Sequence, residues 1–350
     1  MKTKKLTFLF LLLTSQALAA SSLPDLVEKV TDGVVNISST RIVKSYIMRG
    51  RPEFFGMFGI PQEMAQKQSS LGSGFIIDAN GYILTNYHVI ENAAEVVVTL
   101  HDKRRIPAEI IGKDKLMDLG LLRLKGGATN KNITFNNLGT SAATRIGESV
   151  FAIGNPFGLT NTVTSGIISA KNRAIGIGPF DNFLQTDCSI NFGNSGGPLF
   201  NMEGEVIGIN TAINAQGQGL GFAIPIDEVK EKLTELKTNG FIARTWIGVF
   251  GENITLALQH YYDLPEDHGV VIARLVEGGP AQKHGLKIGD ILLKVGDNQI
   301  TERADVQRAL SKIKPGVAVK VEFNRQGKVL TREIKLTTAP DSARIPEGVI

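Results

Sequence analysis

Cysteine is almost absent from this chain of 350 residues, which contains only Cys188. No intrachain disulfide can form, so hydrophobic cores must hold the fold together. Cys188 lies seven residues before Ser195, but nothing in its surroundings provides the organised base that a catalytic thiol needs. We therefore expect a small buried thiol at this position.

Sequence motifs for bound nucleotides and metals are also missing. There is no Walker-type Gly-Lys-Ser/Thr motif, which argues against an internal ATPase. The glycines at 217, 219 and 221 lie in a β pattern without a βαβ setting, which favours a flexible loop over a nucleotide site. No HExxH motif or paired cysteines indicate a metal site, so we expect no metal and no other cofactor.

Excess positive charge is lacking once the N-terminus is set aside. The formal net charge is +4, and Lys2, Lys4 and Lys5 supply three of these charges, which leaves +1 for the chain after Ala19 (4 − 3). The basic pI is therefore no argument for a nucleic-acid partner, and we expect none.

Apolar runs long enough to span a membrane are absent after the N-terminus. The run from Leu6 to Leu13 is much shorter than the ~20 residues of a membrane-spanning helix. It follows three lysines and precedes Ala17-Leu18-Ala19, a small-x-small cleavage pattern. Residues 1–19 are thus predicted to be a cleavable signal peptide, with an uncleaved anchor and membrane association as the alternative.

A single serine is surrounded by glycines in the run Gly193-Asn194-Ser195-Gly196-Gly197. Such a run occurs in plain turns between strands. It also suits a nucleophile, because glycines let the backbone bend so that its N–H groups point at a developing oxyanion. The second interpretation requires a base and an orienting carboxylate elsewhere in the chain.

Those partners lie upstream of the serine. His88 follows an apolar run, and Asp118 opens the segment Asp118-Leu119-Gly120-Leu121-Leu122. His88 precedes Asp118 by 30 residues, and Asp118 precedes Ser195 by 77. The order His, Asp, Ser is that of chymotrypsin-like enzymes, in which His is the general base and Asp fixes its tautomer.

Short strands separated by turn residues fill the first two-thirds of the chain. Residues 34–38, 74–78, 95–100 and 106–111 form one set, and residues 150–153, 162–165 and 206–210 form another. Regular short strands without long helices predict barrels. Residues 43–70, including Phe54, Phe55 and Phe58, are predicted to be a long loop, and a helix capped by Asp227 is predicted to end at Asn239-Gly240.

These motifs together resemble the Deg/HtrA family of trypsin-fold serine proteases. The resemblance rests on residues 85–90, 118–124 and 193–199, and it extends to residues 154–158, 163–170, 185–187 and 219–225. After residue 245, Trp246-Ile247-Gly248-Val249, Gly278-Gly279-Pro280-Ala281 and the segment 285–292 resemble one PDZ domain.

The resemblance implies a mostly β fold: a chymotrypsin/trypsin-like double six-stranded β-barrel followed by one α+β PDZ domain. It places a protease domain at 23–240, the PDZ domain at 245–340 and a tail at 341–350. It implies an ATP-independent periplasmic serine endopeptidase of stress response and protein quality control, which cleaves unfolded proteins. The partners it implies are unfolded substrates, peptide C-termini and further copies of the chain in a homotrimer or larger oligomer.

The same resemblance assigns roles to individual residues. The expected catalytic residues are His88, Asp118 and Ser195, and the expected oxyanion hole is Gly193, Asn194 and Ser195. Residues expected to line the substrate pocket are Thr211, Ala212, Ile213, Asn214 and Ala215. The expected carboxylate-binding loop is Trp246, Ile247, Gly248 and Val249, and Arg173 is the expected regulatory arginine in the loop from Lys171 to Phe183.

Substrate preference is only partly indicated by the sequence. Ser189 lies six residues before the nucleophile, where a pocket for Arg or Lys would have Asp. Ile213 favours small or medium aliphatic side chains. Asn214 and Phe192 depart from the family pattern and leave the preference and the oxyanion hole open.

Two other functions remain possible from the sequence. One is a membrane-tethered regulatory protease that cleaves a single signalling protein. The other is a chaperone or peptide-binding scaffold. A histidine base predicts that turnover rises with pH around the ordinary histidine pKa of about 6.5.

Overall fold

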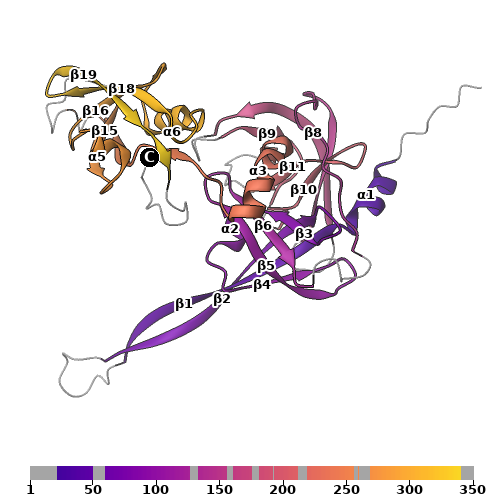
Figure 1. Ribbon diagram of the computed structural model, residues 1–350. Helices are drawn as coiled ribbons and strands as arrows, with labels where there is room; N and C mark the ends of the chain where they lie inside the picture. The colour runs from indigo at the N-terminus through magenta and orange to yellow at the C-terminus, as the bar shows by residue number, and fades with distance from the viewer. Residues whose placement is uncertain are drawn as a thin grey trace, which may run out of the picture.

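The computed structural model describes residues 22–49, 60–126, 133–155, 161–175, 181–191, 193–211, 219–255, 259 and 269–339. Two closed barrels and a separate smaller sheet follow one another along the chain (Figure 1). The mostly β fold with two six-stranded barrels, which the family resemblance implies, is confirmed, and both barrels are antiparallel.

The first barrel has the strand order β1-β2-β3-β6-β5-β4. Helix α1 (Leu23–Thr31) precedes it, with Ser22 and Asp25 forming a reciprocal capping box. Helix α2 (Tyr87–Ile90) follows β3. The strands are β1 (Val34–Arg49), β2 (Ile60–Ile76), β3 (Tyr82–Thr85), β4 (Glu95–Thr99), β5 (Arg105–Asp114) and β6 (Leu119–Leu124).

The second barrel has the order β10-β11-β12-β9-β8-β7. It is followed by helix α3 (Ile226–Asn239), which ends at Gly240 with a φ of 80°, as the Asn-Gly pair predicts. The strands are β7 (Ser149–Gly154), β8 (Thr162–Arg173), β9 (Phe183–Thr186), β10 (Pro198–Asn201), β11 (Val206–Thr211) and β12 (Gly221–Pro225).

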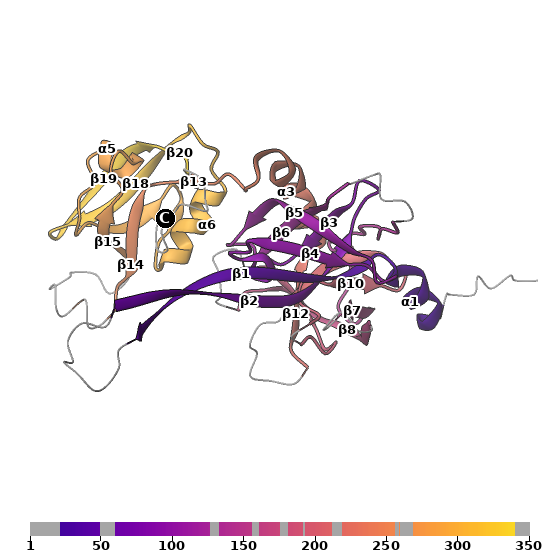
Figure 2. The same cartoon turned by 90° about the horizontal axis from the view of Figure 1, so that it is seen from below.

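Residues after 244 form the smaller sheet and its helices (Figure 2). Strand β13 (Thr245–Trp246) pairs with β20 (Thr337–Thr338). The main sheet has the order β14-β15-β16-β18-β19, and the short β17 (Asn298–Gln299) pairs with β16. The other elements are β14 (Val249–Asn253), β15 (Val270–Leu275), β16 (Ile291–Val295), β18 (Ala318–Arg325), β19 (Lys328–Lys335), α5 (Pro280–Lys283) and α6 (Arg303–Ser311).

The expectation of a long loop over residues 43–70 is wrong for residues 43–49 and 60–70, which are strands. Strands β1 and β2 pair without interruption from Val34↔Phe75 to Arg49↔Ile60 and form the two-stranded ribbon that extends from the barrel in Figure 1. The sequence of the ribbon lacks the alternation of apolar and polar residues that marks a half-buried strand, so the pattern does not predict two strands. Phe54, Phe55 and Phe58 lie outside the described residues.

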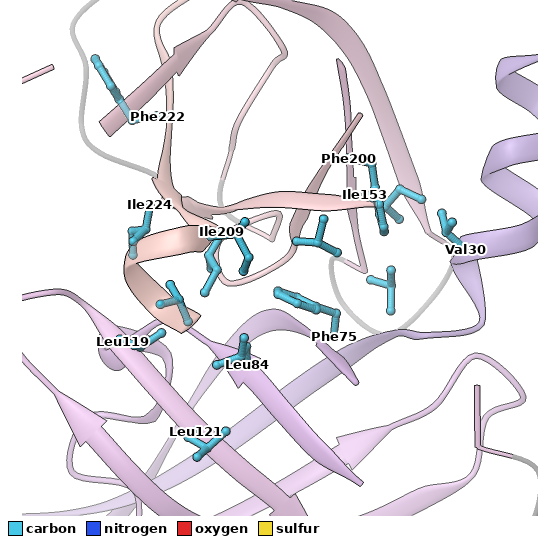
Figure 3. Close-up of a cluster of buried hydrophobic side chains, with 14 of the residues drawn as sticks. Val30, Phe75, Leu84, Leu119, Leu121, Ile153, Phe200, Ile209, Phe222 and Ile224 are labelled. Atoms are coloured by element: carbon cyan, nitrogen blue, oxygen red, sulfur yellow. The ribbon is translucent and has the colours of Figure 1, made fainter. Parts of the chain in front are cut away.

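The two barrels share one hydrophobic core at their contact (Figure 3). Phe75 and Leu84 of the first barrel belong to the same buried cluster as Phe200 and Ile209 of the second. The cluster also takes in Val30 of α1. Burying the apolar surface of both barrels together fixes their relative orientation, and therefore fixes the groups that meet at the seam between them.

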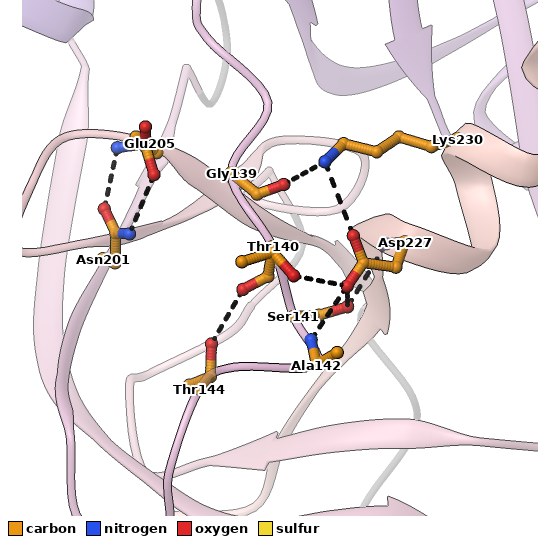
Figure 4. Close-up of polar contacts among 9 residues, drawn as sticks. All are labelled: Gly139, Thr140, Ser141, Ala142, Thr144, Asn201, Glu205, Asp227 and Lys230. Carbon is orange, nitrogen blue, oxygen red and sulfur yellow. Dashed lines mark hydrogen bonds and ion pairs between the residues drawn. The ribbon is translucent and has the colours of Figure 1, made fainter.

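Asp227 does not cap helix α3, contrary to the expectation. Pro225 is the N-cap residue and makes no side-chain cap hydrogen bond. The Asp227 carboxylate instead accepts hydrogen bonds from Thr140 Oγ1 (2.8 Å), Ser141 Oγ (3.1 Å) and the Ala142 N–H (2.8 Å), as Figure 4 shows. It therefore joins the helix to the segment that leads into the second barrel.

Candidate active site

Asp118 is bound to the His88 segment through both its side chain and its backbone. Its carboxylate accepts from the His88 N–H (3.0 Å) and lies 2.9 Å from His88 Nδ1. Its carbonyl accepts from the Tyr87 N–H (3.0 Å) and from Asn86 Nδ2 (3.1 Å). Asp118 has a φ of 50°, the left-handed region that Asp tolerates better than most residues. The short turn between β5 and β6 thus presents its carboxylate to the imidazole.

The second barrel reaches the same carboxylate through Thr211. Its hydroxyl, at the end of β11, donates to Asp118 Oδ2 at 3.1 Å. The carboxylate therefore accepts hydrogen bonds from both barrels. Such an acceptor is held in one orientation, as required of a group that orients the histidine and stabilises an imidazolium.

The serine segment is fixed against the histidine segment. The Ser195 carbonyl accepts from the Ser73 N–H at 2.9 Å, and the Gly196 N–H donates to Asn210 O at 2.8 Å. A Cβ at Gly196 would lie 2.4 Å from Thr85 Oγ1 and 3.1 Å from the backbone nitrogen of Asn86. The sequence-predicted His88, Asp118 and Ser195 therefore lie in segments that meet at the seam of the barrels.

The three residues expected to form an oxyanion hole differ in their hydrogen bonds. The Asn194 N–H donates to Asn191 O at 3.0 Å, and Asn194 Nδ2 donates to Ser189 O at 3.0 Å. Asn194 thus shapes the turn and does not offer its N–H to a substrate. Gly193 has a φ of 121°, a conformation that suits glycine, and its N–H has no acceptor among the described residues. Phe192 lies outside those residues.

The remaining predicted site residues are only partly described. Ala212, Ile213, Asn214 and Ala215 lie outside the described residues. Arg173 is exposed at the end of β8, where its Nε donates to Gln185 Oε1 at 2.9 Å. This contact holds the arginine on its own barrel.

The segment Trp246–Val249 joins β13 to β14. Ile247 and Val249 are fully buried, and Gly248 has a φ of 80° between them. The carbonyl of Ile247 accepts from the Ala281 N–H and that of Gly248 from the Val276 N–H. Strand β14 is the first strand in the sheet order, so one of its edges has no neighbouring strand among the described residues.

The electrostatics of the site act on His88. Burial of the imidazole lowers its pKa, but the hydrogen bond and negative charge of Asp118, with a contribution from Glu91, outweigh it. The pKa of His88 is therefore raised above 6.5. Cys188 is buried as expected, and burial raises the pKa of its thiol, so it is not a ready nucleophile.

Sequence reasoning missed the residues under the serine loop. Ser73, Thr85 and Asn155 are buried polar residues that connect this loop to the first barrel. The only local signal for Ser73 is its position between Gly72 and Gly74, where a Cβ at either glycine would meet side chains closer than 3.0 Å. The hydrogen-bond partners of its side chain, Gly193 and Asn155, are more than 80 residues away in the sequence, so no local pattern marks them.

Neither a metal site nor a membrane-spanning helix is found in the described part of the chain. No group of His, Cys, Asp and Glu side chains there could hold a metal ion. None of the helices described has the length and apolarity to cross a membrane.

Two antiparallel six-stranded barrels with a His–Asp pair and a glycine-flanked serine at their seam define a trypsin-like serine peptidase. Residues 72–209 match the trypsin-like peptidase domain family, and residues 247–336 match the PDZ domain family. The chain belongs to the HtrA-type, DegP-like family of serine endoproteases, and it is a peptide-bond hydrolase with one trypsin-like domain and one PDZ domain.

Relatives in two bacteria support this assignment. A "Probable periplasmic serine endoprotease DegP-like" of Pseudomonas putida (strain GB-1) is 39% identical over 353 residues, which cover 94% of this chain and 73% of the relative. A protein of the same description in Halomonas elongata is 38% identical, and the aligned region covers 95% of this chain and 75% of that relative.

Solved structures are similar over the same length. "HtrA-type protease AlgW with decapeptide" has a TM-score of 0.70 at 34% identity, covering 91% of this chain and 99% of that one. A serine endoprotease from Yersinia pestis has a TM-score of 0.66 at 32% identity, again covering 91% of this chain and 99% of that one.

Proposed function

We propose that His88, Asp118 and Ser195 are the catalytic triad of an ATP-independent endopeptidase of protein quality control that cleaves unfolded chains in the periplasm. The observation that carries the proposal is the Asp118 carboxylate held between His88 Nδ1 and Thr211 Oγ1, beside the fixed serine loop. Residues 23–240 are the protease domain and residues 245–340 the PDZ domain. The helix end at Gly240 and the start of β13 at Thr245 support this boundary.

The mechanism follows from the orientation of the imidazole. Nδ1–H donates to Asp118, which leaves Nε2 to accept the proton of the Ser195 hydroxyl as the serine attacks the scissile carbonyl. The tetrahedral oxyanion is stabilised by the N–H groups of Gly193 and Ser195, while Asp118 stabilises the imidazolium. His88 then protonates the leaving amine, and water releases the acyl group by the reverse sequence.

The second part of the proposal is that the PDZ domain binds peptide C-termini. The carboxylate-binding loop is Trp246–Val249, where the left-handed Gly248 turns the backbone before β14. A bound peptide adds a strand to the free edge of β14. That an HtrA-type protease has been solved with a decapeptide supports peptide binding in this family.

Localisation, assembly and regulation complete the proposal. We propose that the N-terminal lysines and the apolar run after them direct export to the periplasm. The names of the relatives, which include the word periplasmic, support this. We propose a homotrimer or larger oligomer, regulation through Arg173, and a substrate pocket formed by residues 211–215.

Cleavage of an unfolded protein tests the function. A reduced and alkylated polypeptide should be cut at many sites without ATP, and the same polypeptide in its folded form should resist cleavage. The Ser195→Ala variant should leave both intact, as mass spectrometry of the products would show. Cleavage of a single partner protein only would favour the regulatory protease, and suppressed aggregation that Ser195→Ala does not change would favour the scaffold.

The same cleavage assay, with peptides added, tests whether the PDZ domain binds peptide C-termini. Peptides with a free C-terminal carboxylate should alter the cleavage rate, and the same peptides with an amidated C-terminus should not, because amidation removes the charge that backbone N–H groups bind. Equal effects of both peptides would contradict carboxylate recognition.

The pH dependence of turnover follows from the raised pKa of His88. The protonated imidazole cannot act as a base, so kcat/KM should rise as the pH passes through this pKa. Since the Asp118 carboxylate raises the pKa, we expect the midpoint above 6.5 and not at the ordinary value. A pH–rate profile measures this midpoint, and one at or below 6.5 would show that the carboxylate does not act on the imidazole as the structure indicates.

A further inference from the structure

We propose that Ser73, which lies outside the proposed triad and oxyanion hole, is a positioning residue that holds the oxyanion-binding backbone in shape. The inference deepens the proposed function and depends on it. Ser73 lies near the end of β2 and is fully buried between the first barrel and the serine loop.

All polar atoms of Ser73 are hydrogen-bonded, and all except its carbonyl bond across the seam. Its N–H donates to Ser195 O at 2.9 Å, and its hydroxyl donates to the Gly193 carbonyl at 2.5 Å. The same hydroxyl accepts from the Asn155 N–H at 2.8 Å, and its carbonyl accepts from Thr85 Oγ1 at 2.7 Å. One residue of the first barrel therefore binds the residues on both sides of Asn194, Gly193 through its side chain and Ser195 through its backbone N–H.

The peptide between Gly193 and Asn194 is consequently fixed at both ends. Its carbonyl oxygen is held by the Ser73 hydroxyl, and its N–H is held by Asn191 O at 3.0 Å. This peptide lies between the two N–H groups that are proposed to bind the oxyanion, those of Gly193 and Ser195. Rotation of the peptide would turn these two donors away from each other. Gly193 has a φ of 121°, and a glycine opposes such a rotation less than a residue with a side chain, so the peptide needs support from its neighbours.

Hydroxyl chemistry is required at position 73. A serine hydroxyl donates one hydrogen bond and accepts others, so it can satisfy the Gly193 carbonyl and the Asn155 N–H at once. An alanine would leave both buried backbone groups without this partner. Buried polar groups are strongly driven to find another partner, and rotation of the 193–194 peptide is the available route.

Asn155 extends the support into the first barrel. Its carbonyl accepts from Asn36 Nδ2 at 2.8 Å, and that amide also donates to Gly72 O. Ser73 is thus held in place by buried neighbours and is not a mobile side chain. A fixed hydroxyl costs no reorganisation as the oxyanion forms, which is the condition for effective electrostatic stabilisation.

Kinetics of the Ser73→Ala variant test the inference. We expect kcat to fall about 10- to 100-fold with KM changed less than about twofold, because oxyanion binding acts in the transition state; loss of one oxyanion donor costs about 10²- to 10³-fold. Affinity for a peptide boronic acid, whose tetrahedral adduct occupies the oxyanion hole, should fall in parallel. Affinity of the same peptide without the boronic acid should stay constant, and so should the pH midpoint of the rate.

Ser141→Ala is the matched control. Ser141 is also buried, and its hydroxyl also donates one hydrogen bond and accepts one, but its partner is Asp227 at the start of α3. This variant should lose stability without loss of kcat or boronic acid affinity. If Ser73→Ala does not fold, Ser73→Cys replaces it, since a thiol fills the site and donates weakly; the same kcat and boronic acid losses are then expected.

Unchanged kcat in a folded Ser73 variant would overturn the inference, as would a loss that Ser141→Ala reproduces or a loss confined to KM. These outcomes differ from failure of the proposed function. In that case the wild-type chain itself would not cleave the unfolded polypeptide, or Ser195→Ala would cleave it equally well.

Discussion

Replacement of Asp118 by asparagine is expected to lower kcat by about 10⁴-fold, the loss known for this substitution in the trypsin triad. The physical reason lies in the tautomer of His88. Asp118 accepts from Nδ1, so the proton lies there and Nε2 stays free as the base. An asparagine amide would donate to Nδ1 and force the proton onto Nε2, where it blocks transfer from Ser195.

The size of the effect distinguishes a tautomer defect from a structural one. The asparagine oxygen can still accept from the His88 N–H, and the second hydrogen of its amide can donate to Thr211 Oγ1, so the variant should fold. Removing the negative charge also removes the main influence that raises the pKa of His88, so the residual rate should have a lower pH midpoint. Single-turnover kinetics and a pH–rate profile measure both.

Asp227→Asn provides the control for this substitution. The Asp227 carboxylate also accepts several hydrogen bonds, from Thr140, Ser141 and Ala142, yet it lies at the start of α3 and outside the proposed triad. It should retain wild-type kcat. If Asp118→Asn kept more than a tenth of wild-type kcat, the carboxylate would not be part of the catalytic machinery.

The sequence was sufficient to predict the barrels and the three proposed catalytic side chains. Each of these has a local signal: glycines around Ser195, an apolar strand before His88, and an apolar strand after Asp118. The strands around these residues form two closed barrels, as the pattern of short strands predicts. The three residues lie in segments that meet at the seam between the barrels.

Features that depend on distant partners were missed. The two strands of the ribbon pair with each other over a long stretch, but their sequence lacks a period of two. Asp227 has the sequence position of a helix cap, but donors from residues 140–142 occupy its carboxylate. The role of Ser73 depends on contacts with residues 82 and 120 positions away, which no window along the chain contains.

A second distant contact lies at the junction between the two domains. Arg244, just before β13, makes a bidentate ion pair with Asp114 at the end of β5. Its Nη2 donates to Oδ1 at 2.8 Å, and its Nη1 donates to Oδ2. Asp114 is only 1% exposed. The Arg244 carbonyl accepts from the Ala339 N–H at 2.7 Å, so this one residue contacts both domains.

Arg244→Leu is therefore expected to destabilise the protein by about 3–5 kcal/mol, the cost of leaving one partner of a buried ion pair without the other. Desolvation of the Asp114 carboxylate is no longer offset by the guanidinium, although the Met117 N–H still donates to it at 2.8 Å. Urea unfolding, monitored by circular dichroism and by tryptophan fluorescence, measures the loss of stability. Trp246 is the single tryptophan and lies two residues from the substitution.

Two further variants show whether the buried charge is the cause. Arg145 forms an ion pair with Glu148 at 2.6 Å, but its side chain is 82% exposed, so Arg145→Leu should leave the urea midpoint unchanged. Combining Arg244→Leu with Asp114→Asn removes the unpaired charge and should restore part of the lost stability, because breaking a buried pair costs more than replacing both partners. Two results would show that this ion pair does not stabilise the domain junction. One is an equal urea midpoint for Arg244→Leu and Arg145→Leu. The other is a double variant that is less stable than Arg244→Leu alone.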